Sequence, residues 1–298
     1  MKSVLKAVVP SSGLLFVAAL ALGGLPSWMP VGLADSKTVG PSEGQGRITQ
    51  VSVINALMIG RYDGVMPMGE LLQLGDFGIG TLDHLDGEML VLDGHAYQVR
   101  GDGKVLDVGP DRSTPFAVMA RFKEDGKVSC QKVSSLSDLE ARLDSGLKRR
   151  NNFLAVRAEG RFSSITLRSV KRQEPPYRPL GEVAKTQSVW THENVSGTLV
   201  GFRCPAWVKG LNVPGYHWHF LSDDRKVGGH VLDCRTDEAR VKYHIGTDWQ
   251  IKLDDSDAFN EENLGVDLSR DLHRVESLRG VEPATEAKDA RKDEPKRP

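Results

Sequence analysis

The first regular pattern of apolar residues in the chain has helical spacing. Between Arg47 and Arg61, apolar side chains recur every three or four residues, at Val51, Ile54, Leu57 and Met58. This period places them on one face of a helix, and Tyr62-Asp63-Gly64 then interrupts the run. The pattern predicts one amphipathic helix across residues 47–61.

The region from Gly75 to Val108 has a different pattern, in which short apolar runs are separated by glycine-containing turns. The runs Glu88–Leu92 and Ala96–Val99 flank Asp93-Gly94, and Gly101-Asp102-Gly103 follows the second run. Asp-Gly pairs between short apolar runs are typical of tight hairpins. The region therefore predicts a sheet of short, largely antiparallel strands.

The rest of the chain is also predicted to consist mainly of short strands, interrupted by a helix and a linker. A helix is predicted at Ser137–Arg149, where Ser137 is a candidate N-cap and Glu140 would complete a capping box. Gln173–Pro179 contains three prolines and predicts a linker. Strands are predicted at 116–122, 127–133, 153–158, 161–170, 197–204, 215–221, 230–235 and 249–253.

Together these elements predict an α+β fold. We expect two strand-rich halves with mixed or antiparallel sheets and a few helices. The halves are an N-terminal α/β half at residues 35–150 and a C-terminal β-rich half at residues 151–279.

The two ends of the chain have patterns of their own. Lys2 and Lys6 precede the apolar run Leu14–Leu25, and Gly32-Leu33-Ala34 has small residues at the cleavage positions. This predicts a signal peptide at residues 1–34, cleaved near Ala34, and a periplasmic or secreted protein; an uncleaved N-terminal anchor is the alternative. The run is shorter than the ~20 residues that cross a bilayer, so the mature form is not expected to span a membrane. Residues 280–298 are charged and poor in bulky apolar side chains, which predicts a disordered tail.

The composition narrows the class of partner. The formal net charge is −1, and no basic stripe interleaved with aromatic residues indicates nucleic acid. We therefore expect a small-molecule substrate, and a homodimer as the assembly. The chain has three cysteines, Cys130, Cys204 and Cys234, whose spacing resembles no metal site. They are expected to be buried small hydrophobic residues.

The sharpest chemical signal is a group of three histidines. His217 and His219 alternate with aromatic residues in Gly215–Phe220, so in a strand both imidazoles point to one face. The polar turn Ser222–Lys226 allows the chain to return as a hairpin and to bring His230 beside them. Three neutral imidazoles that leave one position open suit a catalytic, zinc-like centre. The sequence thus predicts a metal site on a β-hairpin of the C-terminal half.

Two alternatives accompany this prediction. A single histidine in a strand is more often a hydrogen-bonded residue than a ligand, and only the grouping of three favours a metal. Imidazole ligands suit zinc, iron, nickel or manganese, and spacing does not choose among them. A cupin-like metal-dependent oxidoreductase would use the same histidines, but cupins have a glutamate shortly after the pair. Here the nearby acids are Asp223 and Asp224.

Over nearly the whole mature chain the sequence resembles the alpha-acetolactate decarboxylases. The resemblance rests on Gly75–Thr81 with Leu85–Glu88, on Gly197–Phe202 with Pro205, and on the histidine segment that ends at Gly228–Asp233. Arg168–Val170 and Pro176–Leu180 also resemble the family. The resemblance implies conversion of 2-acetolactate to acetoin and carbon dioxide, with a zinc ion as cofactor.

The resemblance also assigns individual residues. His217, His219 and His230 match the metal ligands, and Glu88 and Arg168 match the active-site acid and arginine. Glu276 matches a further glutamate near the C-terminus, although little motif surrounds it and a long charged tail follows. In this chemistry the metal is a Lewis-acid electron sink, while the glutamate and arginine provide the proton and orient the substrate.

Each of these residues also has a simpler interpretation. Glu88 stands beside a turn, where an exposed acid is ordinary. Arg168 can pair with a surface acid, and Arg157 is a rival for its role. The Thr81 hydroxyl can line the pocket or bond to its own backbone, and the second is commoner in turns.

Overall fold

The structure is a computed structural model of the chain, and it describes residues 46–276. The expected signal peptide and the charged tail lie outside the described residues. Within residues 46–276, no helix is both long and apolar enough to cross a bilayer.

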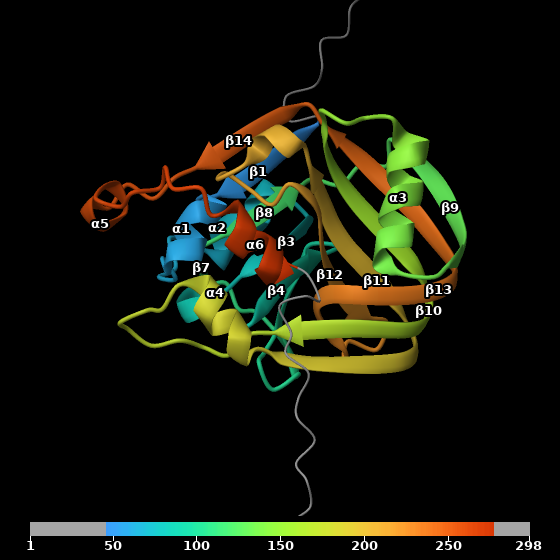
Figure 1. Cartoon of the computed structure of the whole chain (residues 1–298), viewed down its shortest axis with the longest axis horizontal. Helices are drawn as coiled ribbons and strands as arrows, with labels where there is room; N and C mark the ends of the chain where they lie inside the picture. Colours follow the sequence, from blue (N-terminus) through green and yellow to red (C-terminus); the bar gives the residue numbers. More distant parts are fainter. Residues whose placement is uncertain (1–45, 277–298) are drawn as a thin grey trace, which may run out of the picture. The chain divides into compact units, whose positions relative to one another are not determined.

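The first half of the described chain forms a seven-stranded sheet (Figure 1). The strand order is β14-β1-β8-β3-β4-β5-β6, and every neighbouring pair is antiparallel except β1 with β14. The strands are β1 (Arg47–Val51), β3 (Phe77–Thr81), β4 (Glu88–Leu92), β5 (His95–Val99), β6 (Val105–Asp107), β8 (Ala117–Ala120) and β14 (Asp248–Lys252). A separate pair joins β2 (Met66–Pro67) to β7 (Ser113–Thr114).

The second sheet has five longer, antiparallel strands in the order β10-β11-β12-β13-β9. They are β9 (Gly126–Val133), β10 (Phe153–Ser169), β11 (Ser188–Cys204), β12 (Gly215–Ser222) and β13 (Gly228–Gly246). An additional pairing of β10 with β13 closes β10 to β13 into a ring of four strands. Each sheet includes one strand from the other half of the chain: β14 belongs to the first sheet and β9 to the second.

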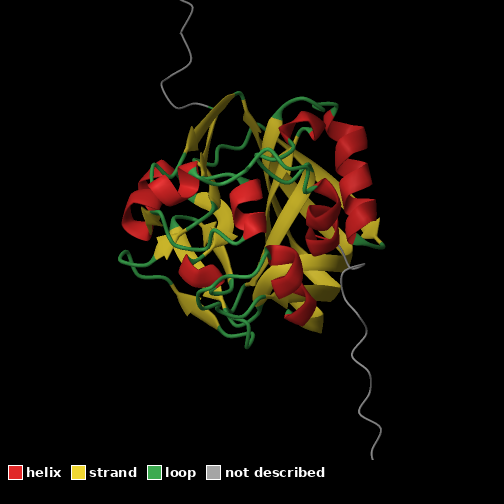
Figure 2. Cartoon of the chain, turned by 60° about the vertical axis from the view of Figure 1, so that its left-hand side comes forward, coloured by secondary structure: helices red, strands yellow, loops and turns green. Residues whose placement is uncertain are grey.

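The helices are short and lie around the sheets (Figure 2). The α-helices are α1 (Ile54–Ile59), α2 (Met68–Leu74), α3 (Leu136–Leu147), α4 (Leu180–Val183), α5 (Asp257–Asn260) and α6 (Ser269–Glu276). Three further 3₁₀ turns are η1 (Asp83–Leu85), η2 (Ala184–Thr186) and η3 (Ala206–Val208). The expected α+β fold with few helices is confirmed.

Apolar side chains pack in layers. The largest cluster joins the two sheets, with Phe77 and Ile79 of β3 against Phe202 of β11. A second cluster packs Leu139 and Leu143 of α3 on the opposite face of the second sheet. The outer face of the first sheet is covered by α2. The space between the two sheets is therefore the dry interior into which functional side chains can point.

The predicted helix at 47–61 is wrong in its first part. Residues 47–51 form β1, between β8 and β14, and only residues 54–59 are helical. Residues 48–51 are all buried, because both faces of this strand are covered. A strand buried on both faces shows no alternation, so its pattern is compatible with a helix.

Two smaller predictions also need correction. The N-cap of helix α3 lies two residues earlier than expected, since Ser135 takes this position and accepts a hydrogen bond from the Asp138 amide. Glu140 instead accepts from Trp218 Nε1 at 3.1 Å. The predicted break at Glu159-Gly160 is a register shift within the continuous strand β10. The Asp93-Gly94 hairpin is confirmed, with both residues at positive φ.

Candidate active site

The three histidines come together on the hairpin of β12 and β13, as predicted from their spacing. His219 lies directly opposite His230 in the β12–β13 pairing. Strand alternation directs His217 and His219 to one face and places the Trp218 ring among the α3-facing side chains on the other. Trp218 is buried and packs under α3, so apolar packing on one face fixes the imidazoles on the other.

A glycine allows the hairpin to approach its neighbour. Gly229 has φ +140, and a Cβ at this position would lie 2.7 Å from the carbonyl oxygen of Arg168. Only a residue without a side chain fits there. The close approach aligns His230 with Arg168 in the β10–β13 pairing.

The imidazole rings form a compact triangle with centroid separations of 5.1, 4.9 and 5.6 Å. One ring nitrogen of each histidine lies within 4.8 Å of one from each of the others. His219 and His230 are buried, and the His217 side chain is 12% exposed. Burial lowers the pKa of His217 to about 3 and holds the pKa values of His219 and His230 well below the ordinary range. The rings are therefore neutral at physiological pH, as metal ligands must be.

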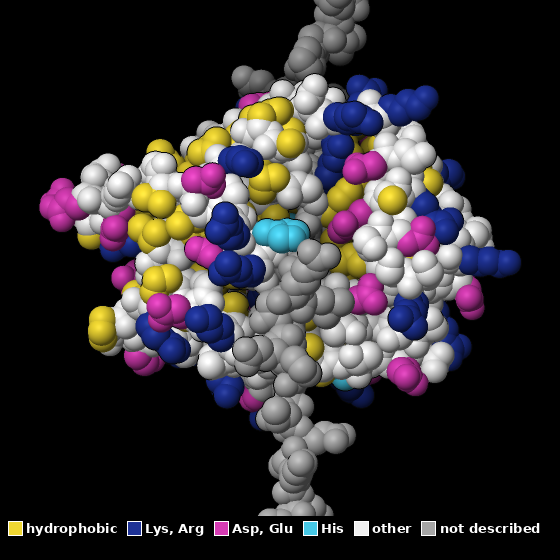
Figure 3. Space-filling view, in the orientation of Figure 1, with side chains coloured by type: hydrophobic (Ala, Val, Ile, Leu, Met, Phe, Trp, Pro, Cys, Tyr) yellow, Lys and Arg dark blue, Asp and Glu magenta, His cyan; other side chains and the backbone are white. Residues whose placement is uncertain are grey.

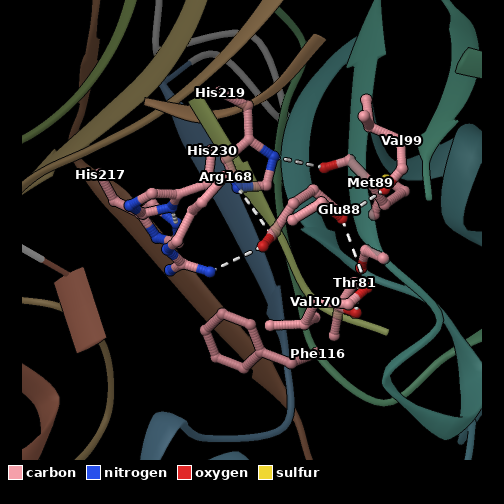
Figure 4. Close-up of polar contacts among 12 residues, drawn as sticks. Thr81, Glu88, Met89, Val99, Phe116, Arg168, Val170, His217, His219 and His230 are labelled. Carbon is pink, nitrogen blue, oxygen red and sulfur yellow. Dashed lines mark hydrogen bonds and ion pairs between the residues drawn. The ribbon is translucent and has the colours of Figure 1, made fainter. Parts of the chain in front are cut away.

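The hydrogen bonding of His219 fits a metal ligand. Its Nδ1 lies 2.8 Å from the carbonyl oxygen of Met89, which can only accept, so the proton is on Nδ1 (Figure 4). Its Nε2 then carries the lone pair, and this buried atom has no hydrogen-bond partner. His217 Nδ1 and Glu276 Oε2 are likewise buried without a hydrogen-bond partner. Buried polar atoms are rarely left unpaired, so these atoms are candidate ligands for a metal ion.

An arginine and two glutamates face the histidines. Arg168, near the end of β10, donates from Nη1 to Glu88 Oε1 at 2.8 Å, and its Nη2 lies 3.6 Å from Glu276 Oε1. Glu88 Oε2 lies 3.4 Å from the free Nε2 of His219. Figure 4 shows the contacts of Glu88 with Arg168 and with His219 as dashed lines.

Both glutamates bind protons more tightly than usual. Desolvation raises the pKa of Glu88 to about 7, an effect that Arg168 partly offsets and Glu276 reinforces. Desolvation likewise raises the pKa of Glu276 to about 6, against the opposing charge of Arg168. Two carboxyl groups share one guanidinium, and each is poised to exchange a proton near neutral pH.

Glu276 enters the site from the last described helix. It ends α6, and its Oε2 lies 3.7 Å from Nε2 of both His217 and His230. The structure thus brings together all six predicted site residues, although they come from β4, β10, β12, β13 and α6.

Two cavities adjoin this cluster. An inner cavity of about 40 Å³ is lined by Glu88, Arg168 and Thr81 and by apolar side chains. An outer cavity of about 920 Å³ extends between α3 and the segment that leads to α6. His217 and Glu276 line both cavities and so separate them.

Sequence reasoning did not identify the apolar wall of the inner cavity. Its members are Ile54, Leu57, Leu85, Phe116, Val170 and Leu180. They come from separate elements and resemble other core residues, so no local signal marks them. Arg157, the rival of Arg168, pairs with Asp93 and Glu159 away from the histidines. The Thr81 hydroxyl donates to the Gly87 carbonyl at 2.7 Å, which is the simpler of its two interpretations.

Comparison with known proteins agrees with the expected family. The sequence profile described as "Alpha-acetolactate decarboxylase" matches residues 48–266. The chain belongs to this family. The match includes five of the six site residues and ends before Glu276. An alpha-acetolactate decarboxylase of Methanosarcina mazei is 48% identical over 227 residues, which cover 76% of this chain and 79% of that protein. One of Bacillus subtilis is 36% identical over 231 residues, or 77% of this chain and 91% of that protein.

Solved structures show the same fold. The crystal structure of alpha-acetolactate decarboxylase from Bacillus subtilis superposes with a TM-score of 0.75 at 36% identity, covering 78% of this chain and 99% of that one. A Staphylococcus aureus protein described as similar to alpha-acetolactate decarboxylase gives a TM-score of 0.74 at 29% identity, covering 77% and 99%. Family members thus share the arrangement of sheets described above.

Proposed function

We propose that this chain decarboxylates 2-acetolactate to acetoin and carbon dioxide at the three-histidine cluster. The relatives of this chain are named alpha-acetolactate decarboxylases, after that activity. The observation that supports it best is the unpaired Nε2 of the buried His219, which faces Glu88 inside a set of three neutral imidazoles. A neutral ligand set beside an acid and an arginine suits a reaction that develops negative charge.

His217, His219 and His230 are the residues that would hold a divalent metal, with Glu276 close enough to assist. The donor set fits zinc, which takes three histidines and keeps a fourth position for substrate. When bound, such a metal supplies a Lewis acid that stabilises developing negative charge on oxygen. The Met89 carbonyl keeps the His219 ring in the ligating tautomer.

Arg168 orients the substrate and balances its negative charge. Its guanidinium is 5% exposed and already bridges two carboxyl groups, so it is held in place before substrate arrives. In the low-dielectric cavity, charge-assisted hydrogen bonds from this group attract the oxygens of a 2-hydroxy-3-oxo acid. Apolar side chains such as Phe116 and Val170 exclude water from the same cavity (Figure 4).

Glu88 provides the proton. Loss of carbon dioxide breaks a carbon–carbon bond, and the electron pair left behind is delocalised into the neighbouring ketone. That carbon must then gain a proton to give the hydroxyketone. With a pKa of about 7, Glu88 is protonated in an appreciable share of molecules at neutral pH and can donate. Its fixed position on one side of the cavity favours a single product enantiomer.

A direct assay tests the proposal. We expect the purified protein to release acetoin and carbon dioxide from racemic acetolactate without oxygen, to lose activity in a chelator and to regain it with Zn²⁺. A cupin-like oxidoreductase would instead consume oxygen with its substrate. A metal-binding protein without catalysis would bind Zn²⁺ and release no acetoin. Either of these results would contradict the proposal.

We also propose that the chain is exported and cleaved near Ala34, and that it assembles as a homodimer. The charged start, apolar run and small residues within residues 1–34 support export. N-terminal sequencing of native protein should begin at or near Asp35, and a start at Met1 would contradict export. Sedimentation should give twice the chain mass, and a monomer at micromolar concentration would contradict the dimer.

A further inference from the structure

Three buried amide side chains lie on β1, at the start of α1 and in the loop before β12, and the proposed reaction uses none of them. Gln50, Asn55 and Asn212 are 0%, 6% and 3% exposed. Asn212 Nδ2 donates to Gln50 Oε1 at 2.6 Å, and Gln50 Nε2 donates to the carbonyl of Leu211 at 2.7 Å. A buried amide is costly unless it is bonded, so the groups that these side chains hold indicate their role.

Asn55, in the first turn of α1, reaches toward the segment that precedes α6. Its Nδ2 donates to the carbonyl of Leu264 at 2.8 Å and to that of Val266 at 3.0 Å. Both hydrogens of the amide are therefore used on one short stretch of backbone. Two bonds to carbonyls two residues apart fix the orientation of that backbone as well as its position.

Apart from the partly buried side chains of Leu264 and Leu268, which pack against the core, the segment 261–268 has few other attachments. Most of its side chains are exposed, and it pairs with no strand in the described part of the chain. Within residues 46–276, its only hydrogen bonds to the fold outside residues 256–276 are the two from Asn55. Beyond the segment, α6 buries Leu272 and Val275 and then presents Glu276 to the histidines. The path from β14 through α5 to α6 can be followed in Figure 1.

The backbone of the same residue holds a second segment. The Asn55 amide donates to the Gly210 carbonyl at 3.2 Å, and the Ile54 amide donates to the Leu211 carbonyl at 2.9 Å. The loop at 205–214 leads directly into β12, which carries His217. Gly210 has φ +79, and a Cβ there would lie 3.2 Å from Asn55 Nδ2, so a glycine allows this close contact.

We propose that Asn55 is a positioning residue for the metal site. It joins the segment that delivers Glu276 to the loop that delivers His217 and His219, and so keeps Glu276 within reach of the imidazoles. Asn55 lines the outer cavity and does not line the inner one, so its effect on the site passes through the chain segments that it binds. The inference rests on the proposed function only in that Glu276 is taken to act at the metal.

The test uses an isosteric change in the full chain. Asn55→Asp keeps the size of the side chain but replaces both N–H donors with an oxygen that faces two carbonyls. Asn55→Ala, which adds no charge, is measured in parallel in case the first variant does not fold. Asn260→Asp is the matched control, because its exposed amide bonds only to carbonyls of its own turn.

Two readouts separate positioning from general stability. We expect hydrogen exchange of amides in 269–276 to rise about tenfold or more in the Asn55 variants, the mark of a locally released helix, with no change in the control. We expect the Zn²⁺ dissociation constant, from chelator competition, to rise on the order of 10-fold, as for residues that support metal ligands. In the Glu276→Gln background, the Asn55 change should add nothing further.

Unchanged exchange in α6 would overturn the proposal. So would an effect on Zn²⁺ affinity that adds in full to that of Glu276→Gln, because Asn55 would then act by another route. Neither measurement involves turnover. A protein that meets both expectations and releases no acetoin would contradict the proposed function and leave the role of Asn55 standing.

Discussion

The two cavities that meet at Glu276 each contain a glutamate whose pKa burial raises to about 7, and the two glutamates have very different surroundings. Glu88, in the inner cavity, has Arg168 at 2.8 Å and His219 at 3.4 Å. Glu140, in the outer cavity, has the indole N–H of Trp218 at 3.1 Å as its side-chain partner within the described residues. The two pKa values are similar, but only Glu88 has a guanidinium group and an imidazole beside it.

The difference shows that a raised pKa alone does not identify a catalytic acid. Desolvation is the largest cause of the shift in both glutamates, and any partly buried carboxyl group shows it. What marks the inner cavity is the combination of unpaired ligand atoms, a held guanidinium and a carboxyl group within a few ångströms. Charged side chains of both signs are spread over the face in Figure 3, so charge on that face provides no comparable signal.

The largest effect is expected from His219, the buried histidine whose Nε2 lies 3.4 Å from Glu88. His219→Ala should lose most bound metal and nearly all decarboxylase activity while the fold survives, because three ligands leave no spare donor and the sheets supply the core. Metal analysis, acetoin release and circular dichroism of the purified variant measure the three parts. His95→Ala, an exposed histidine on the β4–β5 hairpin, is the control. A full equivalent of metal in His219→Ala would remove this residue from the site.

The second-largest effect is expected from Glu88→Gln. Glutamine keeps the size of the side chain but carries no exchangeable acid proton at neutral pH. We expect the metal to remain and kcat to fall on the order of 10²-fold or more, the usual contribution of a positioned general acid. Metal content and kcat are measured on the same preparation. A joint loss of metal and activity would make Glu88 a ligand, and normal turnover would place the proton donor elsewhere.

Glu276→Gln tests the glutamate that lines both cavities. Its Oε2 is buried without a partner 3.7 Å from two imidazoles, so the negative charge should assist metal binding from outside the triangle. We expect Zn²⁺ affinity to fall on the order of 10-fold, as when supporting carboxylates are removed. The measurement is competition with a chromogenic chelator. Unchanged affinity would limit Glu276 to contacts with the substrate.

The smallest effect on activity is expected in the outer cavity. Glu140→Gln should keep kcat within about threefold, because the carboxyl group lies outside the inner cavity and a positioned acid contributes far more than this. A loss as large as that of Glu88→Gln would contradict the contrast between the cavities. The Trp218 indole can still donate to the amide oxygen of glutamine, so the packing beneath β12 should persist.

Glu140 should nevertheless affect stability as the pH changes. Its pKa is about 7 in the folded protein, against 4.5 as its ordinary value, so the folded state binds the proton more tightly. Its contribution is complete below pH 4.5 and is lost as the pH rises through 7. Between pH 5 and pH 8, the melting temperature of the wild type should fall relative to Glu140→Gln by a few degrees, about what 1 kcal/mol produces in a chain of this size. The same difference in melting temperature between the wild type and Glu140→Gln at pH 5 and at pH 8 would contradict this expectation.

The sequence predicted the parts of the site that are local. Strand alternation places His217 and His219 on one face whatever the rest of the fold does, and a polar turn of fixed length returns His230 to them. The outcome is the direct pairing of His219 with His230. The hairpin at Asp93-Gly94 was predictable for the same reason, because its two residues must adopt positive φ.

The parts that depend on distant contacts were not predictable from pattern. β1 is covered on both faces, so its four buried residues in succession carry no period that distinguishes strand from helix. The choice of Ser135 over Ser137 as the cap of α3 places Glu140 under Trp218, a contact between residues 78 positions apart. Resemblance to a family supplied Glu88, Arg168 and Glu276, whose own sequence surroundings resemble ordinary turns and strands.

The ring of four strands, β10 to β13, affects the order in which the protein folds during its synthesis. Arg168 and His230 are aligned across the β10–β13 pairing, which extends to Phe153 and Gly246, so this pairing cannot be completed until residue 246 has left the ribosome. Glu276 follows thirty residues later. Contacts between such distant positions form late and slowly. A nascent chain can therefore form the hairpin that carries the three histidines before Glu276 is made, and the full set of six site residues is present only once residue 276 has emerged.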